Sequence, residues 1–80
     1  MKSFHLIISS VVETYFDGSA VSATLPGSEG EFTLLSHHEP FVSTLKKGTI
    51  VVRLANEETK TFANENGILE FSGNQAVVLL

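Results

Sequence analysis

The residues of this 80-residue chain that are best suited to chemistry lie in one stretch, residues 25–41, LPGSEGEFTLLSHHEPF. The stretch contains three carboxylates, two adjacent histidines, two serines, two prolines and two glycines. Side chains of these types can ligate a metal ion, attack a carbonyl, bind an anion or contact another protein. Each kind of chemistry requires a particular spacing of its residues.

A metal site would have to use His37 and His38, with His5 as a third ligand. Adjacent residues of a strand point to opposite faces, so His37 and His38 would not converge on one ion. The sequence has no cysteine and no second cluster of ligands to complete a tetrahedral site. We therefore predict no metal and no other cofactor. A small metal-dependent enzyme that uses the three histidines is the most distant alternative.

Catalysis is not predicted either. The run Gly27-Ser28-Glu29-Gly30 lacks the G-x-S-x-G spacing of a nucleophile elbow, and no lysine follows it as in a phosphate-binding loop. Glu29 and Glu31 would repel an anion. They also lack the apolar surroundings that adapt a carboxylate to acid–base catalysis. We predict no catalytic residue and interpret the two carboxylates as an exposed acidic tip.

The composition excludes several classes of partner. The net charge is −4, and the five basic residues are scattered except for Lys46-Lys47. Nucleic acids and anionic lipid surfaces are both bound through clusters of basic residues, which this sequence lacks. The apolar run Leu6-Ile7-Ile8 is too short for a signal peptide or a membrane span. The sequence predicts a soluble, unprocessed chain that binds no nucleic acid and does not insert into a membrane.

Alternation of apolar and polar residues with a period of two predicts strands along most of the chain. Phe4, Leu6 and Ile8 share one face of residues 3–9, and residues 49–54 alternate in the same way. Such strands bury one face and expose the other. The chain is therefore predicted to be almost entirely β-structure.

Turn motifs separate these strands at short intervals. The motifs are Asp17-Gly18, Pro26-Gly27, Asn56-Glu57-Glu58, Asn66-Gly67 and Gly73-Asn74. They divide the chain into eight to ten strands, too many for a small flat sheet, so the fold class is all-β: a flattened β-sandwich of about ten short, mostly antiparallel strands. Residues 1–80 are expected to form a single β-sandwich domain. Residues 75–80 are nearly all apolar, which predicts a strand covered on both faces.

Residues 26–40 are predicted to form an interaction loop. Pro26-Gly27 and Gly30 bend the chain, and Ser28 and Glu29 are presented between them. A rigid sandwich that holds a polar loop is a common design for recognition. One functional interpretation is therefore a generic β-sandwich module that binds another protein through residues 26–40. A solvated loop without a partner is the other.

Several motifs occur together in one order along the chain. They are His5-Leu6, Phe16-Asp17-Gly18, residues 25–32, Leu34-Leu35, His38, Pro40, Leu45, Gly48, residues 67–70 and Val77-Val78-Leu79. This ordered set resembles the N-terminal domain of the epsilon subunit of F-type ATP synthases, and the match covers essentially all 80 residues. The resemblance implies a flattened two-layer β-sandwich of about ten strands, in agreement with the alternation.

The resemblance also implies a function. The family domain is a non-catalytic central-stalk (rotor) subunit of a bacterial F-type ATP synthase, and it links the gamma subunit to the polar loops of the membrane c-ring. It thereby couples proton translocation to ATP synthesis, at the cytoplasmic face of the bacterial inner membrane. Many members continue into a C-terminal helical hairpin that inhibits ATP hydrolysis or binds ATP. This chain stops at Leu80, so it corresponds to a short form, natural or truncated, and we expect no nucleotide.

The resemblance implies specific contact residues, which are Ser28, Glu29, Gly30 and Glu31 toward the c-ring and Ser10, His38 and Ser43 toward gamma. Apolar candidates for the gamma-facing patch, which could equally be buried in the sandwich, are Val11, Val12, Phe41 and Val42. Four positions depart from the family pattern: Thr33, Ser36, Glu39 and Asn66. Thr33 stands where the family usually has glycine, and a β-branched residue cannot easily adopt a glycine-only conformation. Either the bend at Thr33 is ordinary or the loop differs locally.

Overall fold

The computed structural model describes residues 2–80, which form nine β-strands and, within that range, no helix. The strands are β1 (Phe4–Ser9), β2 (Thr14–Ala20), β3 (Ser22–Gly27), β4 (Gly30–Leu35), β5 (Phe41–Leu45), β6 (Gly48–Arg53), β7 (Thr59–Asn64), β8 (Gly67–Ser72) and β9 (Gln75–Leu79). Every strand pair is antiparallel except β1 with β9. A helix that could span a membrane is not found in the described part of the chain.

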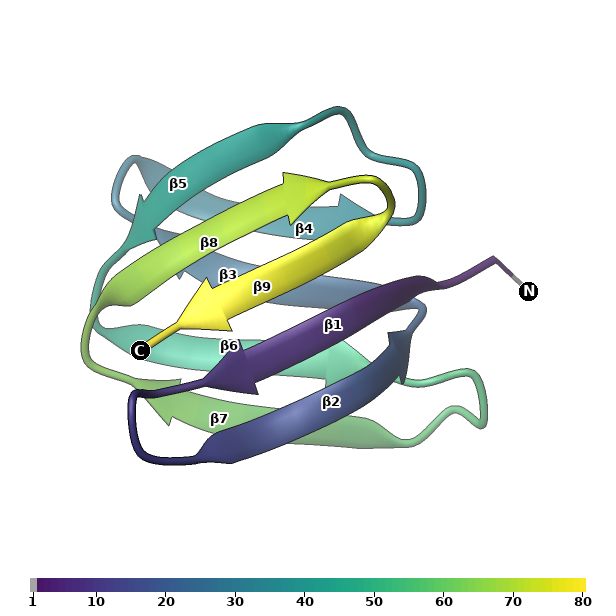
Figure 1. Ribbon diagram of the computed structural model, residues 1–80, viewed down its shortest axis with the longest axis horizontal. Coiled ribbons are helices and arrows are strands. Elements are labelled where there is room, and N and C mark those ends of the chain that lie inside the picture. Colours follow the sequence, from purple (N-terminus) through teal and green to yellow (C-terminus); the bar gives the residue numbers. More distant parts are fainter. Residues whose placement is uncertain (1) are drawn as a thin grey trace.

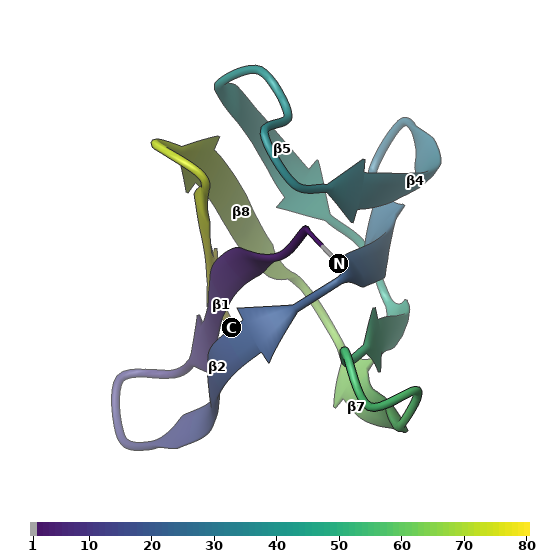
Figure 2. The same cartoon turned by 90° about the vertical axis from the view of Figure 1, so that its right-hand side faces the viewer.

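One sheet supplies both layers of the molecule. Its strand order is β2-β1-β9-β8-β5-β3-β6-β7, with β4 paired to β3. The sheet curls so that β2, β1, β9, β8 and β5 form the front layer in Figure 1, while β4, β3, β6 and β7 lie behind them (Figures 1 and 2). The prediction of a flattened, mostly antiparallel β-sandwich is confirmed, with nine strands in place of about ten.

The two layers are joined at the corner where β5 meets the end of β3. Gly27 pairs with Leu45 there. The backbone N–H of Lys46 donates to the Pro26 carbonyl, and that of Ser28 donates to the Thr44 carbonyl, each at 2.9 Å. These bonds fix the position of the β3–β4 turn relative to β5.

The core lies between the layers and consists of the apolar residues that the alternation predicts. In β1, Phe4, Leu6 and Ile8 are buried, whereas His5 is exposed. The other core residues are Ala20, Ala23, Leu25, Leu34, Leu45, Ile50, Val52, Leu69, Phe71, Ala76 and Val78. At roughly 1.5–3 kcal/mol for each large side chain buried, this cluster is the main source of stability in so small a fold.

Aromatic pairs close the two open sides of the sandwich. Phe32 of β4 packs edge-on against Phe41 of β5, with 5.3 Å between ring centroids. On the opposite side Phe16 of β2 packs against Phe62 of β7 at 6.0 Å. Edge-to-face packing is a favourable geometry for aromatic rings, so these pairs hold the layers together where no strand crosses between them.

Two of the predicted turns lie elsewhere. Asp17 and Gly18 are inside β2, and residues 10–13 form the turn between β1 and β2 instead. The predicted Pro26-Gly27 bend is wrong by two residues, because both end β3 and the turn is at Ser28-Glu29. Asp-Gly is compatible with a strand when its neighbours on both sides continue the ladder, as they do here against β1.

Thr33 is accommodated without strain. It lies within β4 opposite Thr24, and the two side-chain oxygens are 2.9 Å apart. The described non-glycine residues with positive φ are His37, Glu57 and Asn74, so the bend at Thr33 is ordinary.

Strand β9 alternates, contrary to expectation. Ala76 and Val78 are buried, but Leu79 is 52% exposed and Val77 is only partly buried. The prediction that residues 75–80 are covered on both faces is therefore wrong for the chain alone. One face of β9 lies on the outside of the front layer, where other parts of the described chain do not cover it.

Asn74 connects three segments at the end of the molecule where the chain starts. Its side-chain oxygen accepts the His37 N–H at 2.6 Å, and its amide donates to the Ser3 carbonyl at 3.0 Å. Its own carbonyl accepts the His5 N–H at 3.2 Å. Asn74 thus ties the β4–β5 loop to the β8–β9 turn and to the start of β1.

Candidate protein-docking site

The β3–β4 turn is a rigid, exposed structure. Ser28 is held twice, because its N–H donates to the Thr44 carbonyl and its hydroxyl accepts the Thr44 hydroxyl at 2.8 Å. Gly30 has φ +138°, a conformation that other residues rarely adopt. Gly27 is also constrained, since a Cβ there would lie 2.7 Å from the Gly30 carbonyl oxygen and from the Phe32 ring. The geometry of the turn therefore favours glycine at 27 and 30, and the Ser28 hydroxyl adds a bond to β5.

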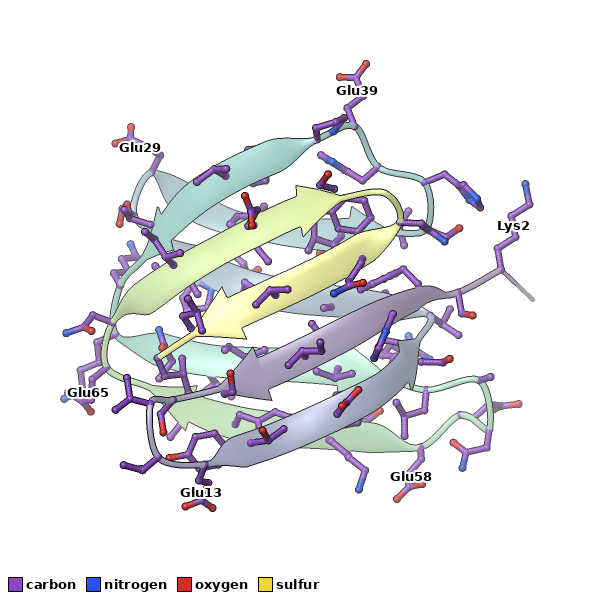
Figure 3. The ribbon with its side chains drawn as sticks, viewed as in Figure 1. Lys2, Glu13, Glu29, Glu39, Glu58 and Glu65 are labelled. Atoms are coloured by element: carbon purple, nitrogen blue, oxygen red, sulfur yellow. The ribbon has the colours of Figure 1, made fainter. Side chains whose placement is uncertain are left out.

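The carboxylates of this turn point into solvent. Glu29 projects from the end of the molecule opposite the start of β1 (Figure 3), and Glu31 is exposed on β4. Throughout residues 2–80 the one ion pair within 4.0 Å joins His5 and Asp17. Glu29 and Glu31 are therefore available to a cationic partner. The structure brings the four predicted c-ring residues, Ser28 to Glu31, together on one rigid hairpin.

The three residues predicted to face gamma are not brought together. Ser10 is in the β1–β2 turn, Ser43 is in the middle of β5, and His38 is in the β4–β5 loop at the other end of the molecule (Figure 1). The His38 ring packs edge-on against Phe41 and Phe71, with centroids 5.6 and 5.8 Å apart. Ser43 lies on the core side of β5, because its partner across the sheet is the buried Leu69. A single partner that contacts all three residues would therefore have to reach around the margin of the front layer.

The outer face of the front layer carries exposed apolar side chains. Cross-strand registry aligns Val42, Glu70, Val77 and Ile7 in one row, and Thr44, Ile68, Leu79 and Ser9 in the next. Val42 is 63% exposed, Leu79 52% and Ile68 43%. We call Val42, Ile68, Val77 and Leu79 the front-face patch. Among the apolar candidates from the sequence, Val42 belongs to this patch, whereas Phe41 packs inward against the core.

Val11 and Val12 form a separate apolar tip. They lie in the β1–β2 turn and are 101% and 83% exposed. The turn is held by the Ser10 N–H, which donates to the Glu13 carbonyl at 2.8 Å. Two fully exposed valines side by side contribute nothing to the core, so they are suited to contact with another protein.

Sequence reasoning did not identify Ile68, Val77 and Leu79 of the front-face patch. The signal was present in residues 75–80, whose continuous apolar run predicted a second covering surface. The structure shows that this surface is not provided by residues 2–80 themselves. The sequence did not indicate which face of β9 points outward, and that face carries the exposed residues.

The adjacent histidines of the sequence do not form a metal-binding cluster with other described residues. His37 and His38 lie in a loop, and not in a strand as the alternation suggests. No group of three or more His, Asp or Glu side chains within residues 2–80 is placed to hold a metal ion. What the geometry offers is a rigid acidic turn, an apolar tip and an apolar sheet face, which are features of protein–protein recognition.

Comparison with known proteins assigns the fold to a family. A profile of the family described as "ATP synthase, Delta/Epsilon chain, beta-sandwich domain" matches residues 3–80. The chain belongs to this family. It is 33% identical over 78 residues to the ATP synthase epsilon chain of Chlorobium limicola and 35% identical over 78 residues to that of Chlorobaculum tepidum. Each match covers 98% of this chain and 89% of the relative.

A solved structure agrees with the epsilon family fold. A chain in the Euglena gracilis mitochondrial ATP synthase, solved as OSCP/F1/c-ring in rotational state 1, superposes with a TM-score of 0.90 at 18% identity. The match covers 96% of this chain and 49% of the Euglena chain. The predicted resemblance to the epsilon subunit is confirmed. As an epsilon-type chain, the protein is a stalk subunit of ATP synthase, a membrane-associated complex, and not the catalytic subunit.

Proposed function

We propose that this chain links the gamma subunit of a bacterial F-type ATP synthase to the c-ring, so that the rotor turns as one body and proton translocation drives ATP synthesis. The observation that carries the proposal is the epsilon-family match across residues 3–80. The chain would act at the cytoplasmic face of the bacterial inner membrane. Residues 1–80 would serve as one β-sandwich domain.

The acidic turn supports a contact with the c-ring. Ser28, Glu29, Gly30 and Glu31 are exposed, rigidly held and without a cationic partner in residues 2–80. Charge complementarity between such a turn and basic or polar c-ring loops would fix orientation more than it would add affinity. This is the role that a coupling contact needs, because slippage must be prevented at every step of rotation.

The front layer supports a contact with gamma. The front-face patch lies on the outer surface of this layer, and Ser10 and His38 lie in loops at its two ends. Ser43 belongs to β5 of the same layer but faces the core side, opposite Leu69. Apolar side chains that are exposed in the chain alone are stabilised when a partner covers them, at about 25 cal/mol for each Å² buried. The proposed gamma surface is thus a face of the sandwich, whereas the proposed c-ring surface is one end of it.

The fold meets the mechanical requirement of this role. One continuous ladder of hydrogen bonds runs through both layers, and a single close-packed core fills the space between them. Protein interiors of crystal-like density transmit strain with little compression. A body measuring about 30 × 24 × 20 Å with these properties transmits torque between two partners.

Reversing one charge tests the c-ring contact. Glu31→Lys places a cation opposite the basic loops, so we expect loss of ATP-driven proton pumping in membranes while the isolated chain keeps its free energy of unfolding within about 0.5 kcal/mol. Glu57→Lys, in the exposed β6–β7 loop at the other end of the molecule, is the matched control and should pump normally. Normal pumping by Glu31→Lys would contradict the c-ring contact, and unfolding would show that Glu31 is structural.

A further inference from the structure

We propose that the groove between β4 and β5 binds an extended, basic polypeptide segment, which adds to the free edge of β4 as a new strand. The inference concerns the chemistry of the groove and goes beyond the proposed function. It does not depend on which subunit supplies the segment.

The groove is a distinct feature of the surface. It has a volume of about 450 Å³ and is lined by residues 29–32 and 41–44. Its closed end is the corner where the Ser28 N–H donates to the Thr44 carbonyl, and the aromatic pair Phe32 and Phe41 provides apolar surface along it. In Figures 1 and 2, β4 and β5 lie at the same margin of the molecule, one in each layer.

The outward edge of β4 has backbone groups available for pairing. Within the described chain β4 pairs with β3 alone. Even-numbered residues of β3 and its turn bond toward β5, as the Pro26 carbonyl and the Ser28 N–H do, so the odd-numbered residues of β3 face β4. The residues of β4 that pair with these odd-numbered residues are Gly30, Phe32 and Leu34. Because bonding alternates along an antiparallel pair, the backbone groups of Glu31, Thr33 and Leu35 point away from β3, into the open side.

The β5 side of the groove contributes in the same way. The Thr44 carbonyl faces β3, so the even-numbered residues of β5 face away from β8. The Val42 backbone groups therefore point toward the groove as well. A polypeptide in the extended conformation is the ligand that satisfies a row of N–H and C=O groups, and its side chains on one face could rest on the two phenylalanines.

Charge determines the kind of segment. The carboxylates that line the groove are Glu29 and Glu31, and both are exposed. Lys46 follows β5 directly, yet its ammonium lies more than 4.0 Å from either carboxylate. The one ion pair found within residues 2–80 joins His5 and Asp17. A segment with lysine or arginine at alternate positions would place its charges beside these carboxylates.

The other two sheet edges are less suited to strand addition. An edge is commonly protected by lysine or by an inward-pointing charge. Strand β7 carries Lys60 at a position whose partner, Val52, faces the core. Strand β2 carries Asp17 and Gly18, and glycine weakens a strand. Strand β4, Gly-Glu-Phe-Thr-Leu-Leu, contains neither lysine nor proline, and its one glycine is its first residue, whereas Gly18 lies inside β2.

Peptide binding to the full 80-residue chain tests the inference. The probe is the capped hexapeptide Thr-Lys-Val-Lys-Val-Thr, titrated while amide signals are followed by NMR. We expect binding, with protection from hydrogen exchange gained by the amides of Glu31 and Thr33. The charge-reversed control peptide, Thr-Glu-Val-Glu-Val-Thr, should bind at least about tenfold more weakly. Glu31→Gln should weaken binding of the lysine peptide about three- to tenfold, whereas Glu57→Gln should leave it unchanged.

Backbone methylation separates strand addition from simple charge attraction. A lysine peptide with alternate N-methylated amides keeps its charges but cannot complete a ladder on β4, so it should lose at least about tenfold in affinity. Equal binding of the methylated and unmethylated peptides, protection at β2 or β7 in place of β4, or no binding at all would each overturn the inference. Failure of the peptide to bind would leave the proton-pumping assay unaffected, which tests the proposed function separately.

Discussion

Gly67 shows how a single residue is fixed by its neighbours. It begins β8, and a Cβ placed on it would lie 2.5 Å from the Leu79 carbonyl oxygen and 3.3 Å from the Leu80 side chain. Gly67 has no positive φ, so the constraint is close approach of the backbone and not a left-handed conformation. The Asn66-Gly67 pair is typical of a turn, but the need for glycine comes from β9, which pairs with β8.

Gly67→Ala should therefore destabilise the chain. The methyl group forces β8 and β9 apart at this point, and overpacking of this kind costs about 1–3 kcal/mol. The free energy of unfolding, measured with urea, reports the change. Gly18→Ala is the control, because its Cβ would meet only ordinary contacts with the Phe16 ring at 3.6 Å. Equal stability of the two variants would contradict the close approach.

At the scale of elements, the loops at one end of the molecule are tied together by Asn74. This residue has φ +58°, which asparagine tolerates better than most residues, and its side chain bonds to two other segments. The sequence predicted a turn at Gly73-Asn74, and the structure confirms it. The hydrogen bond to His37 across 37 residues was not predictable, because local sequence carries no information on which distant loop a turn will meet.

Asn74→Gly isolates the contribution of the side chain. Glycine keeps the left-handed conformation but removes two hydrogen bonds, so we expect a loss of about 1–3 kcal/mol in the free energy of unfolding. The His37 amide should also exchange with solvent faster, since its acceptor is gone. Asn56→Gly is the matched control, because its side chain bonds only to Glu58 within one loop. Unchanged exchange at His37 in the Asn74 variant would contradict the role of Asn74.

At the scale of the whole molecule, the two layers differ in what they expose. The front layer presents the front-face patch, with Leu79, Val42 and Ile68 each at least 43% exposed. The back layer presents mainly threonines: Thr24, Thr33, Thr49 and Thr61 lie on the side of β3, β4, β6 and β7 away from the core, together with Leu35 of β4, which is 57% exposed. The front layer therefore exposes more large apolar side chains than the back layer.

Leu79→Glu tests the front layer as the gamma surface. A charge in the centre of an apolar interface leaves a buried carboxylate unpaired, so we expect at least a tenfold loss of co-purification with the gamma subunit, equivalent to about 1.4 kcal/mol or more. The isolated chain should remain folded, because Leu79 is half exposed. Thr61→Glu, on the back layer, should co-purify normally. Normal co-purification of Leu79→Glu, or loss of co-purification in Thr61→Glu, would refute the assignment.

The sequence by itself determined the fold class, the core and the family. Period-two alternation selects one buried face for each strand, so Phe4, Leu6, Ile8, Ile50 and Val52 were identifiable as core residues from the order of amino acids alone. The acidic turn at Ser28 to Glu31 was also predicted, although Pro26 and Gly27 end β3 and the turn itself is at Ser28-Glu29.

The tertiary structure decided what depends on distant neighbours. It placed Asp17-Gly18 inside β2, joined the layers into one sheet through Gly27 and Leu45, and exposed one face of β9. It also separated Ser10 from His38 and created the groove between β4 and β5. The physical reason is that strand pairing and burial are set by contacts between segments far apart in the chain, whereas alternation and turn residues report only on the local backbone.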